Sequence, residues 1–269
     1  MPLNASGRGA HVRNANRVAD SVAEVDTLRN LIADAARVVV FTGAGISTES
    51  GIPDFRSPGG IWTKFQPIDF RDFISSVDIR KEAWRRRIGM HDTFRQAQPN
   101  RGHRAVAKLV ADGKASSVIT QNIDGLHQAA GVPDGQVIEL HGNNTYAKCL
   151  DCSKRFDLDT IIEAFKQDEI PPVCDVCEGI VKTATISFGQ MMPEHEMMRS
   201  QEEALSCDLF IVMGSSLVVF PAAGFPLLAK KNGAKLVIIN RDETDQDDFA
   251  DLVVHAGIGD TLGSAVGVE

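Results

Sequence analysis

Six short apolar runs, rich in Val, Ile, Leu and Phe, constrain most strongly what this chain can fold into. Each is apolar nearly throughout instead of alternating, which is typical of a strand covered on both faces. Residues 22–36 and 103–111 carry apolar side chains at helical spacing instead. Strands that alternate with helices predict an α/β protein with a Rossmann-like, doubly wound parallel sheet. The predicted strands are 37–41, 117–120, 137–140, 209–213, 235–239 and 252–254.

Glycine or polar residues follow five of these runs directly. In open α/β sheets, ligands bind outside the carboxyl ends of the strands, so these segments are expected to meet at one edge. Any single one of them is better interpreted as a turn, but the five together predict a binding cleft. The segments are Thr-Gly-Ala-Gly at 42–45, Gln-Asn-Ile-Asp at 121–124, His141-Gly142, Gly-Ser-Ser at 214–216, and Asn240.

Two regions interrupt the strand pattern and predict a smaller, discontinuous domain. Residues 56–100 form a helical insertion with a helix around 78–95, and residues 143–184 form a cysteine-containing, zinc-binding module. The remaining segments, 21–55, 101–142 and 185–269, are assigned to the Rossmann-like domain. The first 19 residues contain three arginines, no acid and no apolar core, so we expect residues 1–20 to be disordered and not a secretory signal.

Composition excludes several classes of protein. The net charge is −8, which argues against general nucleic-acid binding. No apolar run approaches the roughly 18 residues of a membrane span, so no membrane partner is expected. Five cysteines are too few for a disulfide scaffold at this length, and four of them form two C-x2-C pairs. Metal binding in a reducing compartment is therefore expected, and we predict a cytoplasmic protein.

The two cysteine pairs have the spacing of a zinc site. Cys149-x2-Cys152 and Cys174-x2-Cys177 are separated by 21 residues, close to the usual four-thiolate arrangement. Four thiolates leave no open coordination position, so one structural Zn²⁺ is predicted. A nucleic-acid-binding zinc ribbon is the alternative, and it is disfavoured because acids outnumber bases in this segment. Cys207 is expected to be a small buried residue.

The glycine-rich loop by itself predicts phosphate binding. Gly43 and Gly45 match the first two glycines of a dinucleotide fingerprint, but Thr48 stands at the third position. No obvious acid follows at a strand end about 20 residues later. The loop is therefore a moderate signal for phosphate binding through backbone N–H groups and a poor signal for an ordinary dehydrogenase.

The residues after this loop carry a resemblance to a known family. Residues 43–56, Gly-Ala-Gly-Ile-Ser-Thr-Glu-Ser-Gly-Ile-Pro-Asp-Phe-Arg, resemble the sirtuin signature along their whole length. The resemblance continues through residues 121–127, His141-Gly142, the cysteine pairs, Phe188-Gly189, 214–217 and Asn240, and spans about 25–262. It implies a protein lysine deacylase that consumes NAD as a co-substrate. The insertion resembles class II sirtuins of mitochondria and bacteria.

The resemblance also implies which residues bind NAD. The phosphate loop would approach the phosphates, Gln121 and Asn122 would position the ribose, and Ile123 and Asp124 would engage the nicotinamide amide. Residues after the fourth and fifth strands would hold the adenosine half. The complete set implied is Gly43, Ala44, Gly45, Ser47, Asp54, Phe55, Arg56, Gln121, Asn122, Ile123, Asp124, Gly214, Ser215, Ser216, Asn240 and Ile258.

The catalytic residues implied are His141, Asn122 and Asp124. The acyl oxygen of an acyl-lysine would attack the ribose carbon as nicotinamide leaves, while Phe55 excludes water. His141 would then take a proton from the ribose hydroxyls, a role that suits a side chain with a neutral-range pKa. The products would be lysine and 2′-O-acyl-ADP-ribose. The other histidines are interpreted as structural or solvent-exposed.

The substrate is expected to be an extended peptide of an acylated protein. The segments that match the family's peptide groove contain Phe188 and Gly189 on one side and Val218 and Val219 on the other. Because such binding uses mainly backbone hydrogen bonds, sequence preference should be loose. Gln190 stands where the family more often has Glu.

The acyl preference is predicted from the insertion. The desuccinylase branch holds an acidic acyl group with a Tyr-x-x-Arg pair, but the single tyrosine here, Tyr146, lies in the zinc module. Trp84-Arg85-Arg86-Arg87 occupies the comparable helix, and we interpret these arginines as a solvated face. Neutral acyl groups should therefore be removed faster than succinyl. Arg87 is the residue that could reverse this order, since a guanidinium alone can pair with a carboxylate if it points inward.

Three other functions are considered beside deacylation. In a protein mono-ADP-ribosyltransferase a protein nucleophile would capture the ribose, and product analysis separates the two reactions. An NAD dehydrogenase would change nicotinamide absorbance. A non-catalytic NAD- or zinc-binding module is disfavoured by the intact set of Asn122, Asp124 and His141.

Overall fold

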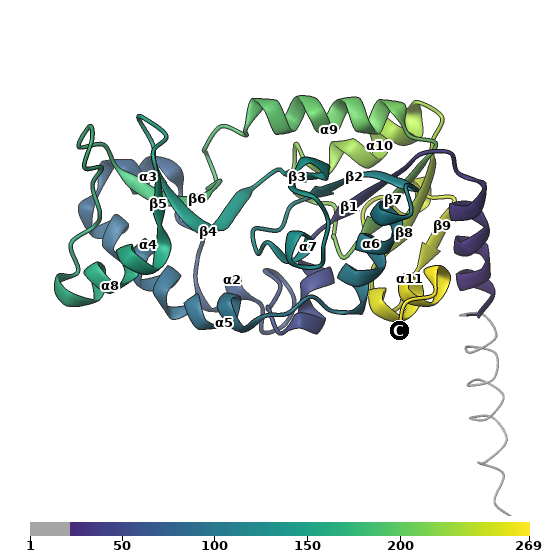
Figure 1. The fold of residues 1–269 in the computed structure, drawn as a ribbon, viewed down its shortest axis with the longest axis horizontal. Coiled ribbons are helices and arrows are strands. Elements are labelled where there is room, and N and C mark those ends of the chain that lie inside the picture. Colours follow the sequence, from purple (N-terminus) through teal and green to yellow (C-terminus); the bar gives the residue numbers. More distant parts are fainter. Residues whose placement is uncertain (1–21) are drawn as a thin grey trace, which may run out of the picture.

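The structure is a computed structural model that describes residues 22–269. The prediction for residues 1–20 lies outside this range. A six-stranded sheet with strand order β3-β2-β1-β7-β8-β9 lies beside a three-stranded sheet with order β5-β4-β6 (Figure 1). The strands of the larger sheet are β1 Val38–Thr42, β2 Ala115–Thr120, β3 Val137–Glu139, β7 Leu209–Met213, β8 Lys235–Ile239 and β9 Leu252–Val254.

The larger sheet is parallel throughout and covered by helices on both faces. Successive residues of β1 enter opposite layers: Val38 and Val40 pack in one core cluster, Val39 and Phe41 in the other. The first layer contains the helix of residues 22–34 together with α6 (Arg101–Ala111) and α11 (Ile258–Val266), and the second contains α9 (Glu194–Ser206) and α10 (Gly224–Lys231). This two-sided burial explains why the strands are apolar throughout. The doubly wound α/β fold is confirmed.

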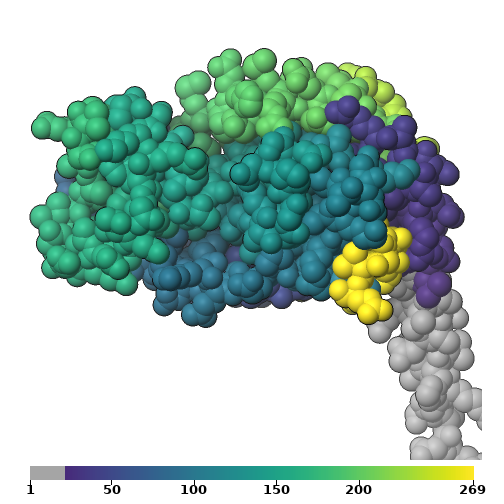
Figure 2. Space-filling model, in the orientation of Figure 1, coloured from purple at the N-terminus to yellow at the C-terminus, as the bar shows by residue number. Residues whose placement is uncertain are grey.

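The smaller sheet is antiparallel and is packed against helices on one side. Its strands are β4 Gly142–Cys149, β5 Arg155–Asp157 and β6 Val181–Thr185. Its core joins Trp84 of α4 to Phe165 of α8 and to Ala147 and Val181 of the sheet. The helices of this part are α2 Ile61–Lys64, α3 Phe70–Ser75, α4 Val77–Gly89, α5 His91–Gln96 and α8 Leu158–Asp168. Figure 2 shows residues of β4 to β6 projecting beside the larger body.

Four short elements complete the described part of the chain. The 3₁₀ helix η1 covers Ala44–Ser50, η2 covers Asp134–Gln136 and η3 covers Asp247–Phe249, and α7 is Leu126–Ala129. Within residues 22–269, no helix has both the length and the apolar character needed to cross a bilayer.

The structure corrects the predicted helix at 78–95. Two helices occupy this range, because α4 ends at Gly89 and α5 begins at His91. The intervening Met90 has ψ 0°, outside the helical minimum, and donates its N–H to Arg87 O at 3.3 Å. The remaining strand predictions agree with the structure to within two residues, and those at 209–213, 235–239 and 252–254 agree at both ends.

Candidate active site and metal centre

A cavity of about 510 Å³ lies at the carboxyl edge of the parallel sheet. This volume is in the range of sites for cofactors and small ligands. Its wall is made by the segments that follow β1, β2, β3, β7 and β8, as the sequence predicts. The predicted residues that line it are Gly43, Ala44, Gly45, Asp54, Phe55, Arg56, Gln121, Asn122, Ile123, His141, Phe188, Gly189, Gly214, Ser215, Ser216, Val218, Val219, Asn240 and Ile258.

The glycine loop is held by backbone contacts to the end of β7. Gly43 N–H donates to Met213 O at 3.0 Å, and Gly45 N–H donates to Gly214 O at 2.8 Å. A Cβ atom at Gly45 would lie 2.7 Å from Gly214 Cα, closer than real contacts permit. Glycine is therefore required because two backbones touch here. The loop continues into η1, and of its first three N–H groups that of Ala44 can face an anionic phosphate, because Gly45 N–H and Ile46 N–H already donate to carbonyl oxygens.

Aromatic rings and a guanidinium form the side of the cavity nearest the smaller sheet. The Trp62 ring lies between Phe55 and Phe188, with ring centroids 5.4 and 5.5 Å apart. The Arg56 guanidinium carbon lies 4.2 Å from the Trp62 centroid. Burial lowers the pKa of Arg56, and the carboxylate of Asp54 partly offsets this shift. Arg56 therefore keeps its positive charge near neutral pH.

His141 is oriented by a hydrogen bond to the main chain. Its Nδ1 lies 3.0 Å from Gln121 O, and a carbonyl oxygen can only accept, so Nδ1 carries the proton. Nε2 then has a free lone pair, and the ring lines the cavity. Burial lowers the pKa of His141, while the bond to Gln121 O raises it less. The result is a neutral imidazole with a basic nitrogen available to a ligand.

Ser47 and Asp124 are joined by a hydrogen bond beside the cavity. The Ser47 hydroxyl donates to Asp124 Oδ2 at 2.7 Å, and the Asn122 amide donates to Ser47 Oγ and to Gly43 O, both at 3.1 Å. Burial raises the pKa of Asp124, and the bond from Ser47 lowers it less. Neither Ser47 nor Asp124 lines this cavity, but Asp124 lines a further cavity that shares Ile123 with it.

Two buried histidines support these residues from below. His127 Nε2 lies 2.9 Å from Thr42 Oγ1, and His103 Nδ1 accepts from Asn100 N–H at 3.3 Å, as part of a capping box that starts α6. The two rings are 5.2 Å apart. Burial lowers the pKa of His103 to about 4 and that of His127 to about 3. Both are therefore neutral and structural, as the sequence predicts.

Several cavity residues were not found from the sequence. Trp62 carries no motif of its own, and its position between two predicted residues depends on packing. The polar run Arg241, Asp242 and Glu243 lines the cavity directly after Asn240. These residues follow strand β8 directly, and a polar run at a strand end is a signal from which they could have been predicted. Asp242 and Glu243 are acids at a strand end, although none was found about 20 residues after the glycine loop.

The expected peptide groove is an open edge of the same cavity. Phe188 and Val218 are about half exposed, and Phe220 is 68% exposed. Phe188 O accepts from Phe70 N–H at 2.8 Å, which ties this edge to α3. Gly189 has φ 76°, and a Cβ atom there would lie 2.8 Å from Asp69 Oδ2. A side chain at this position would therefore displace the groove.

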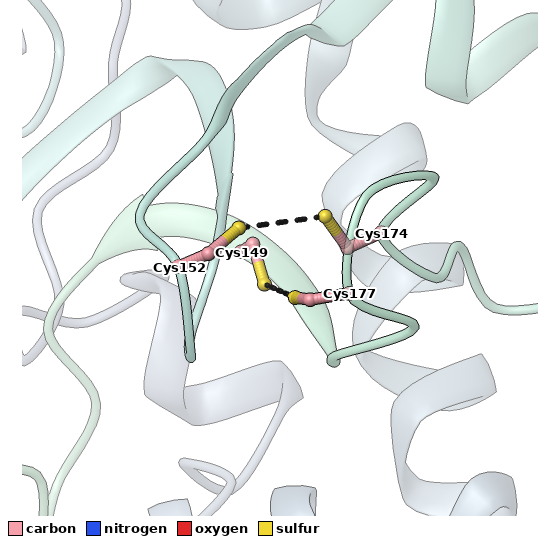
Figure 3. Close-up of side chains that lie close together, drawn as sticks. All are labelled: Cys149, Cys152, Cys174 and Cys177. Atoms are coloured by element: carbon pink, nitrogen blue, oxygen red, sulfur yellow. Dashed lines mark hydrogen bonds between the residues drawn. The ribbon is translucent and has the colours of Figure 1, made fainter.

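The four cysteines predicted as ligands meet in the smaller sheet (Figure 3). Cys149 Sγ lies 3.5 Å from Cys177 Sγ, and Cys152 Sγ lies 3.6 Å from Cys174 Sγ, with all four atoms within 4.8 Å of one another. Tetrahedral Zn²⁺ with bonds of 2.3 Å places its sulfurs about 3.8 Å apart. The cluster fits this ion.

Backbone groups around the cluster suit thiolate ligands. Asp151 N–H points to Cys149 Sγ at 3.4 Å, and Val176 N–H points to Cys174 Sγ at 3.5 Å. Such bonds stabilise negative charge on sulfur. Cys207 is buried apart from the cluster, as predicted.

The fold and the site define a doubly wound α/β protein with a nucleotide-sized cavity at its sheet edge and a separate four-thiolate metal module. Residues 43–221 match the Sir2 family. The chain is 60% identical over 243 residues to NAD-dependent protein deacetylase 1 of Bradyrhizobium diazoefficiens, covering 90% of this chain and 95% of that one. It is 44% identical over 232 residues to the NAD-dependent protein deacetylase of Thermodesulfovibrio yellowstonii, covering 86% and 90%. The chain belongs to the Sir2 family.

Solved structures agree with this assignment. A Sir2 variant with deacetylated p53 peptide and 3′-O-acetyl-ADP-ribose has a TM-score of 0.82 at 36% identity, covering 90% of this chain and 97% of that one. A Sir2 protein bound to a propionylated peptide has a TM-score of 0.77 at 36% identity, covering 88% and 95%.

Proposed function

We propose that this protein is an NAD-dependent protein lysine deacylase. The observation that carries the proposal is the His141 ring, which is neutral, fixed in one tautomer by Gln121 O, and open to a cavity with a glycine-rich phosphate loop. Relatives named NAD-dependent protein deacetylase support it. An acyl-lysine and NAD are converted with water to lysine, nicotinamide and 2′-O-acyl-ADP-ribose.

NAD binds along the strand ends. The glycine loop faces the phosphates through the N–H of Ala44, with the charge of Arg56 beside them. Gly214, Ser215, Ser216, Asn240 and Ile258 hold the adenosine half. Gln121, Asn122 and Ile123 hold the other ribose and the nicotinamide. Asp124 engages the nicotinamide amide, with its carboxylate positioned by Ser47.

The chemistry depends on alignment and exclusion of water. The acyl oxygen attacks the ribose carbon as the bond to nicotinamide breaks, and Phe55 covers that carbon. His141 Nε2 then accepts a proton from the ribose hydroxyls, which directs one of them to the acyl carbon. The residues contribute mainly by holding the groups in contact and by keeping water away from the oxocarbenium-like centre.

Zn²⁺ is a structural ion held by Cys149, Cys152, Cys174 and Cys177. It supplies no reacting group, because four thiolates leave it no open position. Its role is to close the two cysteine turns at the end of the smaller sheet. We also propose that residues 56–100 and 143–184 form one small domain beside a Rossmann-like domain of 21–55, 101–142 and 185–269.

The partners are acyl-lysine segments of proteins, bound as an extended strand between Phe188-Gly189 and Val218-Val219. Main-chain pairing gives such a groove affinity with little sequence preference. Cysteines that bind metal and form no disulfide suit a reducing compartment, and we place the protein in the cytoplasm.

An acetyl-lysine peptide, incubated with and without NAD and separated by mass, tests the function. We expect free lysine only when NAD is present, with one nicotinamide formed for each lysine. Peptide that stays acetylated with folded, zinc-loaded protein and NAD would refute the proposal.

A further inference from the structure

The Ser47 hydroxyl lies at the centre of a buried hydrogen-bond cluster. Ser47 is 1% exposed, and within residues 22–269 its oxygen has three side-chain partners. It donates to Asp124 Oδ2 at 2.7 Å, accepts from the Asn122 amide at 3.1 Å, and lies 3.5 Å from His103 Nε2. Asp124 and Asn122 belong to the proposed NAD site, whereas His103 belongs to the first turn of α6. The third contact therefore joins a core helix to the site.

The direction of the contact between His103 and Ser47 follows from the other ring nitrogen. Asn100 N–H can only donate, and it points to His103 Nδ1 at 3.3 Å, so Nδ1 carries a lone pair. The ring is 0% exposed, and burial lowers its pKa to about 4. It is therefore neutral and holds its one proton on Nε2. His103 thus donates to Ser47 Oγ, and the cap at Asn100 determines this tautomer.

The tautomer of His103 sets the direction of the Ser47 hydroxyl. A hydroxyl oxygen has one proton and two lone pairs. At Ser47 both lone pairs face donors, His103 Nε2–H and the Asn122 amide. The Ser47 proton is left for the Asp124 carboxylate, to which it makes the shortest of the three bonds. With its proton on Nδ1 instead, His103 would offer a bare Nε2 that competes with Asp124 for the Ser47 proton.

The same hydroxyl holds both site residues that it joins. Asp124 Oδ1 accepts from Leu126 N–H at 3.0 Å, so the bond from Ser47 to Oδ2 is a second attachment of the carboxylate. The Asn122 amide donates to Ser47 Oγ and to Gly43 O, both at 3.1 Å. Two attachments define the plane of each group. Rotation of the Ser47 hydroxyl would therefore release both side chains.

The neighbouring His127 provides an internal comparison. It is 1% exposed, its ring lies 5.2 Å from that of His103, and its Nε2 lies 2.9 Å from Thr42 Oγ1. The Thr42 hydroxyl in turn donates to Thr120 Oγ1 at 2.8 Å. His127 therefore bonds to a hydroxyl of the sheet instead of Ser47. Two imidazoles of similar burial thus differ in which hydroxyl they orient.

We propose that His103 is a positioning residue for the nicotinamide end of NAD. Its Nε2–H directs the Ser47 hydroxyl to Asp124, and Ser47 holds Asp124 and Asn122 where they engage the nicotinamide amide and its ribose. The inference rests on the proposed deacylase function, in which these two residues act on that end of the cofactor. His103 does not line the cavity and touches no reacting atom, so it acts through Ser47.

Substitutions of His103 separate positioning from packing. His103→Leu fills the buried space but loses the donor, whereas His103→Gln offers an oxygen to Asn100 N–H and an NH₂ group to Ser47. Nicotinamide leaves as a product, so its inhibition of the reaction reports on its own binding. His103→Leu should raise the nicotinamide inhibition constant and lower kcat/KM for NAD, each about tenfold, the scale of one hydrogen bond. His103→Gln should restore both to near native.

Two controls separate this effect from a loss of packing. ADP-ribose lacks nicotinamide, so its dissociation constant, measured by calorimetry, should stay close to native in His103→Leu. His127→Leu should lower the temperature of unfolding as His103→Leu does, but keep the nicotinamide inhibition constant close to native. Parallel weakening of ADP-ribose and nicotinamide in His103→Leu would overturn the proposal. Equal effects of the two leucine variants on nicotinamide would overturn it as well.

The native protein tests the same claim if His103→Leu does not fold. NMR of isotopically labelled histidine distinguishes a protonated ring nitrogen from a bare one. We expect His103 to carry its proton on Nε2, whereas His141, which is bonded to Gln121 O, carries it on Nδ1. A proton on Nδ1 of His103 would contradict the proposal.

Failure of the inference can be told from failure of the function. If the native protein deacylates no acetyl-lysine peptide, the proposed function is wrong, and calorimetric titration then compares NAD with ADP-ribose. His103→Leu should still weaken the binding of NAD and leave that of ADP-ribose unchanged. If the native protein is a deacylase and folded His103→Leu keeps the native nicotinamide inhibition constant, only the inference is wrong.

Discussion

The cavity at the edge of the parallel sheet and the cysteine cluster of the smaller sheet are built in different ways. The cavity is assembled from the ends of five strands, and much of its wall is main chain held by the sheet. The cluster depends on four side chains from two turns, in a three-stranded sheet with a small core. The sheet thus provides the first site before any ligand binds, whereas the second needs its metal to hold the surrounding fold.

This difference predicts which changes are tolerated. In the cavity, removal of one side chain should impair a chemical step and leave the sheet folded, because the strands are buried on both faces. In the cluster, removal of one side chain should unfold its surroundings and impair activity only indirectly. Substitutions in the cavity should therefore reduce turnover without reducing stability, whereas substitutions in the cysteine cluster should reduce both.

The largest effect is expected from Cys149→Ser. Loss of one thiolate should release the zinc and unfold the smaller sheet at a cost of several kcal/mol, since structural zinc binding supplies folding energy. Elemental analysis and thermal unfolding measure this. Cys207→Ala, a cysteine outside the cluster, should keep one zinc per chain. A stable, active Cys149→Ser protein without metal would contradict the claim that the metal holds the fold of the smaller sheet.

The next effect is on turnover alone. His141→Ala should reduce kcat at least about a hundredfold, the usual scale for a general base, while thermal unfolding and NAD affinity stay close to native. The control is His195→Ala, because His195 is an exposed residue of α9. Near-native deacylation by folded His141→Ala protein would show that another group is the base.

A smaller effect is expected from Gly45→Ala. The new Cβ atom would be forced against Gly214 Cα, so the phosphate loop must shift and KM for NAD should rise about tenfold. Gly135→Ala adds the same methyl group where nothing lies within 4 Å. Steady-state kinetics with varied NAD compares the two. An unchanged KM in Gly45→Ala would mean that this backbone contact does not position the loop.

The smallest expected effect is a shift of the acid limb of the pH–activity profile to lower pH. His141 acts as a base when neutral, and burial lowers its pKa below the ordinary value of 6.5. Activity should therefore persist as pH falls through 6.5 and be lost only below it. Burial also raises the pKa of Asp124 above its ordinary value, so residual activity of Asp124→Asn should be profiled as well. An acid limb above pH 6.5 in both proteins would contradict the environment described for His141.

Elements that depend on local pattern were predictable from the sequence. The strand at 209–213 is apolar at every position because both of its faces are covered, and its bounds are those predicted. The cysteine spacing alone indicates the metal module. The glycine loop is also local, since Gly43 and Gly45 are required by one backbone contact.

Features that depend on packing between distant segments were not predictable. Nothing near Trp62 in the sequence shows that it will lie between Phe55 and Phe188. The hydroxyl of Ser47 meets Asp124 across 77 positions, a contact that only the fold brings about. Lys182 lies on a short strand of mixed composition, and only the fold shows that it is buried.

The identity of the acyl-bearing product tests the central claim most directly. The native protein should be given an acetyl-lysine peptide and NAD, and all products should be resolved by mass spectrometry. The account predicts nicotinamide, free lysine peptide and O-acetyl-ADP-ribose in equal amounts. Free acetate formed without NAD consumption, or a peptide that carries ADP-ribose, would contradict it.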